Sequence, residues 1–303
     1  MSRFGFALIT LIIFQLSCKQ TVPEQPGDTF TFSYQGRKRT YQLYVPANIL
    51  SQSNVPLVLS FHGGGGNAEN QARISEFNPL ADEHGFIAVY PNGSGRLDDR
   101  LLTWNGSGCC GYAQENNIDD VGFIRRLVIE LESQYPIDRK RVYATGFSNG
   151  GIMSYRLACE ASDLFAAVAP VSATLQFNEC HPDHPVSIIH FHGTQDEHLP
   201  FEGGQGEESM AGVDFKPVAE TLAFWIQENR CPSRADQNND GEIIHLSYAP
   251  CDGNTAVELY EILGGGHVWP GSDGPAGPFG DEPTQSISAT QLIWDFFASH
   301  PKP

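Results

Sequence analysis

Ser148 stands in the pattern Gly146-Phe147-Ser148-Asn149-Gly150, between an apolar stretch that ends near Thr145 and a helix-like stretch that follows. This G-x-S-x-G pattern is typical of a serine on a sharp strand-to-helix turn, which projects the hydroxyl from the edge of a sheet. The flanking glycines suit such a turn because side chains at their positions would clash. The pattern favours Ser148 as a catalytic nucleophile over a serine in an ordinary structural turn.

A serine hydroxyl needs a base to remove its proton and an acid to orient that base. His267 follows a predicted strand in the stretch Gly264-Gly265-Gly266-His267, whose glycines can carry an imidazole over the sheet edge. Asp196, in His192-Gly-Thr-Gln-Asp196, follows another predicted strand and gives the chain order Ser, Asp, His of an α/β-hydrolase. Glu197 is the alternative acid, and His267 could instead be a surface loop residue.

The negative charge that forms on a substrate carbonyl oxygen needs hydrogen-bond donors. The run His62-Gly63-Gly64-Gly65-Gly66 follows a predicted strand, and its glycines leave backbone N–H groups free to face a bound carbonyl. We expect the donors of this oxyanion site to be the backbone N–H groups of Gly64 and Asn149, although the pattern does not separate Gly64 from its neighbours. A phosphate-binding loop is disfavoured because no Gly-Lys-Ser/Thr follows.

The elements that position these residues alternate between strand and helix. Apolar runs predict strands, and apolar residues three or four positions apart predict helices. The predicted strands are 29–34, 40–45, 55–61, 86–90, 141–145, 165–171, 186–192 and 256–262, and the predicted helices are 67–84, 119–135, 149–158, 218–229 and 286–299. This order favours an α/β-hydrolase fold, with an opening β-hairpin and then a mostly parallel central sheet covered by helices on both faces.

Residues 1–17 are predicted to be an export signal. Arg3 precedes an apolar run, Phe4 to Phe14, that is shorter than the about 20 residues a membrane-spanning helix needs. Cys18 after this run resembles the lipidated cysteine of a bacterial lipoprotein signal, but Gln15 stands where an aliphatic residue is usual, so cleavage without lipid is the alternative. Residues 18–28 would then be a linker and 29–303 a single catalytic domain, in a protein that is extracellular, periplasmic or anchored at a bacterial cell surface.

Six further cysteines make an even number, which suits an oxidising compartment. We expect disulfides between Cys159 and Cys180 and between Cys231 and Cys251, because each would close a loop of about 20 residues. Cys109 and Cys110 would then form a vicinal bridge or stay reduced. The spacings lack the Cys-x-x-Cys pairs of a zinc site, so we expect no metal.

The formal net charge is −18, from 18 Lys and Arg against 36 Asp and Glu. A field of this sign repels phosphate backbones and anionic lipids, which argues against nucleic acid as a partner and against membrane contact other than through Cys18. Asp119 and Asp120 open a predicted helix, where capping explains them better than catalysis. The stretch from Asp236 to Gly241 resembles half of a calcium loop, but Ser247 replaces the bidentate Glu, which favours a hairpin turn.

Several further motifs accompany the serine, histidine and glycine patterns. They are Tyr90-Pro-Asn-Gly, Trp104-Asn, Cys109-Cys-Gly, Asp119-Asp-Val-Gly-Phe, Arg141-Val-Tyr-Ala-Thr-Gly-Phe-Ser-Asn-Gly-Gly and Gly266-His-Val-Trp-Pro-Gly. With them the chain, over about residues 30–300, resembles the secreted polyhydroxybutyrate-depolymerase-like and feruloyl-esterase-like enzymes of carbohydrate esterase family 1. The resemblance implies a triad of Ser148, Asp196 and His267 and no metal or cofactor.

We therefore expect a monomeric serine carboxylic-ester hydrolase that acts through an acyl-enzyme. Feruloyl or acetyl esters on plant polysaccharides or their oligomers are favoured, because only four residues follow the last predicted helix and polymer depolymerases often carry an extra binding module. A polyhydroxybutyrate (3-hydroxyalkanoate) depolymerase or oligomer hydrolase is one alternative, and a serine peptidase is another. Trp104 and Trp269 lie in loops on the catalytic side, where they would stack on an aromatic acyl group or a sugar, or simply pack.

Overall fold

The computed structural model describes residues 28–47, 49–97, 100–177, 179–276 and 280–303. Within this part of the chain, ten strands form one sheet in the order β1-β2-β4-β3-β5-β6-β7-β10-β9-β8. Their bounds are β1 Thr29–Tyr34, β2 Arg37–Tyr44, β3 Val55–Phe61, β4 Ile87–Pro91, β5 Ile137–Phe147, β6 Ala167–Val171, β7 Ser187–Gly193, β8 Asp236–Asn239, β9 Ile243–Tyr248 and β10 Val257–Ile262. The six central strands run parallel, and antiparallel pairs flank them on both sides.

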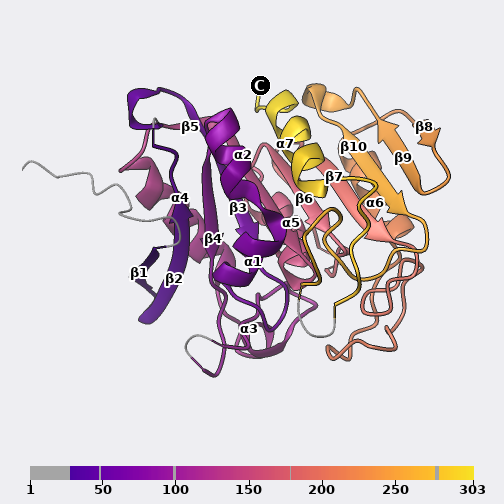
Figure 1. The fold of residues 1–303 in the computed structure, drawn as a ribbon, viewed down its shortest axis with the longest axis horizontal. Helices are drawn as coiled ribbons and strands as arrows, with labels where there is room; N and C mark the ends of the chain where they lie inside the picture. The colour runs from indigo at the N-terminus through magenta and orange to yellow at the C-terminus, as the bar shows by residue number, and fades with distance from the viewer. Residues whose placement is uncertain (1–27, 48, 98–99, 178, 277–279) are drawn as a thin grey trace, which may run out of the picture.

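Helices cover both faces of the sheet (Figure 1). One layer comprises α1 Ala68–Ser75, α2 Phe77–His84 and α7 Ala289–Ser299, and the other comprises α4 Asp120–Glu132, α5 Asn149–Glu160 and α6 Val218–Glu228. A short helix, α3 Gly111–Glu115, precedes α4, and two 3-10 turns span Ile49–Ser51 and Asp252–Asn254. The predicted α/β-hydrolase fold is confirmed.

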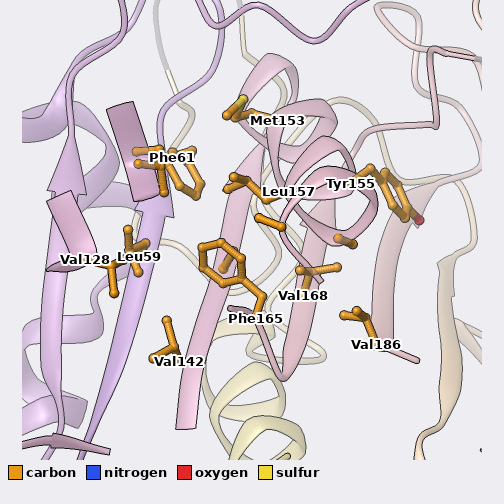
Figure 2. Close-up of a cluster of buried hydrophobic side chains, with 14 of the residues drawn as sticks. Leu59, Phe61, Val128, Val142, Met153, Tyr155, Leu157, Phe165, Val168 and Val186 are labelled. Atoms are coloured by element: carbon orange, nitrogen blue, oxygen red, sulfur yellow. The ribbon is translucent and has the colours of Figure 1, made fainter. Parts of the chain in front are cut away.

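The central strands are rich in apolar residues because both of their faces are buried. Every residue of β3 and of β7 is buried, which is the pattern of a parallel strand between two helix layers. On the α5 side, Met153, Leu157 and Tyr155 pack among side chains of the sheet (Figure 2). This packing fixes α5, and with it the turn that begins the helix.

The predicted helix 67–84 is two helices. The chain breaks at Glu76, which has φ 47°, between α1 and α2. Pro79 explains the break, because inside one long helix its ring would clash with the carbonyl of Ser75. In the first turn of a new helix, where no N–H partner is needed, the proline is tolerated.

The strands β8 and β9 form the hairpin that was expected around residues 236–241. Every residue of β8 is exposed, so no apolar alternation marked it as a strand. In the turn, Asp240 Oδ1 accepts hydrogen bonds from the N–H groups of Glu242 and Ile243, at 3.0 and 2.8 Å. These bonds hold the pKa of Asp240 below its ordinary value, and the carboxylate acts as a turn residue.

Three disulfides join cysteines of the described chain. Two of them are the pairs favoured by loop length, Cys159–Cys180 and Cys231–Cys251, and the third joins Cys109 to Cys110. The predicted export signal and Cys18 lie outside the described residues. Among the helices that the structure describes, none is long and apolar enough to span a membrane.

Candidate active site

Ser148 occupies a sharp turn between β5 and α5. Its φ of 54° and ψ of −121° lie in a region that residues with side chains rarely adopt. A Cβ at Gly146 would lie 2.5 Å from the backbone of Gly150, and a Cβ at Gly150 would lie 2.1 Å from Phe61 O. The two glycines are therefore required, and the half-buried serine is held above the carboxyl edge of the sheet.

Asp196 and His267 form a direct hydrogen bond. The distance from His267 Nδ1 to Asp196 Oδ2 is 2.7 Å, and the pair is buried. The other carboxylate oxygen, Oδ1, accepts bonds from the N–H groups of His198 and Leu199, at 2.9 and 2.8 Å. The carboxylate is thus oriented by two backbone donors, while the exposed Glu197 makes neither of these contacts.

The charge state of Asp196 follows from these contacts. Burial by itself raises the pKa of this carboxyl, but the charge and hydrogen bond of His267, together with His192 and the Leu199 N–H, outweigh it. The net pKa of Asp196 lies below its ordinary value. The group is therefore an anion that can hold an imidazole and stabilise an imidazolium.

His267 is brought to the serine turn by contacts on several sides. Its ring lies 4.7 Å, centroid to centroid, from Phe147, the residue before Ser148. Its backbone N–H donates to Asp281 Oδ2 at 2.5 Å, and a Cβ at Gly266 would collide with that carboxylate. The fold thus places the Asp196–His267 pair beside the turn that carries Ser148.

The glycine run after β3 lies against the same turn. A Cβ built on Gly63 would lie 3.4 Å from Ser148 Cβ, and one on Gly64 would lie 3.7 Å from Asn149 Cβ. Gly65 N–H donates to Leu102 O and Gly66 N–H to Gly63 O, so those two groups are engaged. For Gly64 and Asn149, no backbone partner of the N–H group is recorded within the described ranges.

His62 anchors this glycine run, a role that the sequence analysis did not assign. Its Nδ1 donates to Gly63 O at 2.8 Å, and its Nε2 accepts from Gly93 N–H at 3.0 Å. Burial lowers the pKa of His62 to about 4, so the ring is neutral and the two bonds fix its tautomer. Its position just before four glycines was the only signal available.

A buried chain of hydrogen bonds leads toward Asp196 from behind. Tyr155 OH donates to His190 Nδ1 at 2.7 Å, and His190 Nε2 donates to His192 Nδ1 at 3.0 Å. His192 Nε2 then donates to Leu199 O at 2.8 Å and lies 3.5 Å from Asp196 Oδ2. Burial lowers the pKa of both histidines, so they are neutral and brace the loop that carries the acid.

Of the two alternatives for Trp104 and Trp269, stacking on substrate or packing, the structure favours packing. Both are fully buried, at 0% and 1% exposure. Trp104 Nε1 donates to His62 O at 3.1 Å, and Trp269 Nε1 donates to Thr290 Oγ1 at 3.0 Å. Both rings belong to the packing beneath the site, which their position in loops did not reveal.

The neighbouring acids Asp119 and Asp120 divide into two roles. Asp119 caps α4, as predicted, by accepting from Gly122 N–H at 2.8 Å. Asp120 is instead buried and paired with Arg39, whose Nη2 lies 2.7 Å from Asp120 Oδ1. The prediction of a capping role is therefore incomplete for Asp120, because its partner lies 81 positions away in the sequence.

One group of side chains in the described chain could hold a metal ion. The donor atoms of Asp196, His198 and His267 all lie within 4.8 Å of one another. However, the rings of His198 and His267 are stacked, with centroids 4.7 Å apart and planes only 16° apart. Their in-plane lone pairs do not converge on one point, so the arrangement fits a triad with a stacked imidazole better than a metal centre.

The fold and this arrangement at its carboxyl edge define the α/β-hydrolase class. A family model described as esterase PHB depolymerase matches residues 39–196. The chain belongs to this family.

Proteins similar to this chain are named as acetylxylan or feruloyl esterases. The chain is 28% identical over 269 residues to a bifunctional acetylxylan esterase/xylanase of Neocallimastix patriciarum, covering 86% of this chain and 33% of that protein. It is 31% identical over 230 residues to feruloyl esterase B of Piromyces equi, covering 74% of this chain and 41% of that protein. The chain therefore spans less than half the length of these two relatives. Feruloyl esterase C of Emericella nidulans is 27% identical, with 86% of this chain and 83% of that protein covered.

Solved structures support the fold. The acetyl xylan esterase from Aspergillus awamori has a TM-score of 0.60 at 17% identity, covering 90% of this chain and 100% of that one. A structure titled sOPH native has a TM-score of 0.59 at 17% identity, with 93% and 91% covered. At this identity the likeness concerns the fold alone.

Proposed function

We propose that the protein is a serine esterase that hydrolyses carboxylic esters through an acyl-enzyme on Ser148. The observation that carries the proposal is the 2.7 Å hydrogen bond between His267 Nδ1 and Asp196 Oδ2, beside the strained turn of Ser148. Because the carboxylate engages Nδ1, Nε2 is the ring atom left to take the serine proton.

The reaction has two halves. His267 Nε2 takes the proton of Ser148 Oγ as Oγ bonds to the ester carbonyl carbon, and the N–H groups of Gly64 and Asn149 hold the resulting oxyanion. The intermediate then expels the alcohol, which receives the proton from His267, and leaves an acyl group on Ser148. In the second half, His267 Nε2 takes a proton from water as the water oxygen bonds to the acyl carbon. The bond between that carbon and Ser148 Oγ then breaks, Oγ receives the proton from His267, and the carboxylic acid is released.

Feruloyl or acetyl esters on plant polysaccharides are the proposed substrates. The names of the acetylxylan esterase/xylanase and of feruloyl esterase B support this class. The description of the matching family model favours a second candidate, oligomers of 3-hydroxybutyrate. A serine peptidase would use the same three side chains on an amide.

A substrate panel tests these alternatives. Methyl ferulate, p-nitrophenyl acetate, 3-hydroxybutyrate oligomers and a peptide amide are compared with the wild-type protein and the Ser148→Ala variant. We expect turnover of the ferulate or acetate ester that the substitution abolishes. Cleavage of the hydroxybutyrate oligomers alone would favour the second candidate substrate. Activity that survives Ser148→Ala would contradict the assignment of Ser148 as the nucleophile.

An exported, monomeric protein is part of the proposal. Three disulfides in the described chain support an oxidising compartment. The signal at residues 1–17 and lipid on Cys18 are proposed from the sequence. Mass spectrometry of the mature N-terminus after expression in bacteria tests both, because a lipidated Cys18 adds the mass of its acyl chains, whereas ordinary cleavage adds none.

A further inference from the structure

A polar cavity of about 150 Å³ opens beside the β1–β2 turn. Its lining includes Tyr34, Gln35, Arg37, Arg39, Asn116 and Asn117. Because β2 runs antiparallel to β4, with Tyr41 paired to Pro91, the turn projects past the carboxyl end of β4. The cavity therefore lies at the same edge of the sheet as Ser148, where α/β proteins bind ligands.

Arg39, in the wall of this cavity, is buried and only partly paired. Its Nη2 donates to Asp120 Oδ1 at 2.7 Å and to Asn92 O at 3.2 Å, and its guanidinium stacks 3.7 Å over the ring of Phe123. Its Nε and Nη1 have no hydrogen-bond partner in the described part of the chain. These two atoms are themselves covered by protein, so the groups that meet a ligand in the cavity come from the other lining residues.

The rest of the lining offers both donors and acceptors. Asn117 is exposed, and no hydrogen bond of its side-chain amide is recorded among the described residues. Arg37 is also exposed, with Nη1 3.4 Å from Tyr112 OH. Asp119 supplies an acceptor, because its Oδ2 accepts hydrogen bonds from Tyr34 OH and Gln35 Nε2, at 2.7 and 2.8 Å.

This mixture fits hydroxyl groups, because each hydroxyl both donates and accepts a hydrogen bond. A simple anion suits the cavity less well, because Asp119 lies in its wall and Asp120 already neutralises Arg39. An apolar group is disfavoured because it would leave the amides and guanidinium groups unpaired. A sugar ring is the ligand class that matches both the polarity and the size.

A short segment of chain connects the cavity to the serine turn. Asn105 N–H donates to Asp120 Oδ2 at 2.9 Å, and Trp104 N–H donates to Asn149 Oδ1 at 2.7 Å. We propose that the cavity binds a sugar unit of the glycan that carries the ester, away from the bond that is cut. This inference rests on the proposed esterase function and adds a glycan subsite to it.

The test distinguishes recognition of the glycan from hydrolysis of the ester. Feruloylated xylo-oligosaccharides of increasing length are compared with methyl ferulate as substrates of the wild type and of the Arg37→Ala, Asn117→Ala and double variants. We expect the double variant to raise KM for the longer oligosaccharides about tenfold, which corresponds to the loss of one or two hydrogen bonds. The KM for methyl ferulate should stay unchanged. Lys38→Ala is the matched control, because it removes the same charge from an exposed neighbour outside the cavity lining.

Two outcomes would overturn the subsite. One is an equal fall of activity on both substrates, and the other is no change on either. A second measurement is independent of catalysis: calorimetric titration of unesterified xylotetraose into the Ser148→Ala protein, with and without Asn117→Ala. Binding that Asn117→Ala weakens supports the subsite even if no ester is cleaved, whereas methyl ferulate turnover without any sugar binding supports the esterase and rejects the subsite.

Discussion

Asp196 Oδ2 lies 2.7 Å from His267 Nδ1, across 71 positions of sequence. In Asp196→Asn, the amide oxygen could keep the backbone bonds from His198 and Leu199, while the NH2 group would face Nδ1 and favour the wrong imidazole tautomer. We expect kcat on p-nitrophenyl acetate to fall about 10³- to 10⁴-fold with little loss of stability. Glu197→Gln is the control and should keep wild-type kcat. The assignment of the acid fails if the two variants exchange these behaviours.

The serine turn should not accept a side chain at Gly150. An added Cβ would lie 2.1 Å from the backbone oxygen of Phe61, which belongs to the central sheet and cannot move aside cheaply. We expect Gly150→Ala to lower the free energy of unfolding by about 3 kcal/mol, measured by urea denaturation. Gly274→Ala should change it little, because open space surrounds that position. Equal unfolding midpoints for the two variants would argue against the close approach.

The buried histidines should make the protein less stable in mild acid. The pKa of His62 is lowered by burial from 6.5 to about 4, so below pH 6.5 the unfolded chain takes up a proton that the folded chain refuses. Stability is therefore present above pH 6.5 and is lost as the pH falls toward 4, by about 3 kcal/mol from this residue. His190 and His192 act in the same direction.

Urea unfolding at a series of pH values between 7.5 and 4 measures this loss. In His62→Gln, the dependence of the unfolding free energy on pH should be weaker by up to one proton, whatever the variant's stability at pH 7.5. An unchanged pH dependence would show that His62 is not a neutral buried group.

Local sequence patterns were sufficient for much of the fold and for proposing the three side chains Ser148, Asp196 and His267 as the triad. The apolar-rich runs of β3 and β7 identified central strands. The Gly-x-Ser-x-Gly pattern identified the serine turn, because side chains at its two glycines would clash with the backbone. The position of Asp196 after β7 followed from the order that the fold requires. These features depend on residues that are neighbours in the sequence, or on the order of the strands, and both can be read from one sequence.

Features set by distant contacts were not predictable in the same way. Trp104 and Trp269 stand in loops that fold inward, so their burial depends on segments far away in the sequence. The ion pair of Arg39 with Asp120 likewise joins β2 to α4, two elements that are far apart in the sequence. The cavity beside Arg39 exists only once those elements are packed together.

The most direct test of the account is covalent labelling of the nucleophile. The protein is treated with diisopropyl fluorophosphate, which forms a stable adduct with an activated serine, and is then analysed as an intact mass and by peptide mapping. We predict one adduct per chain, located on Ser148, and none in the Ser148→Ala variant. An adduct on another residue, or equal labelling of the variant, would contradict the assignment of Ser148.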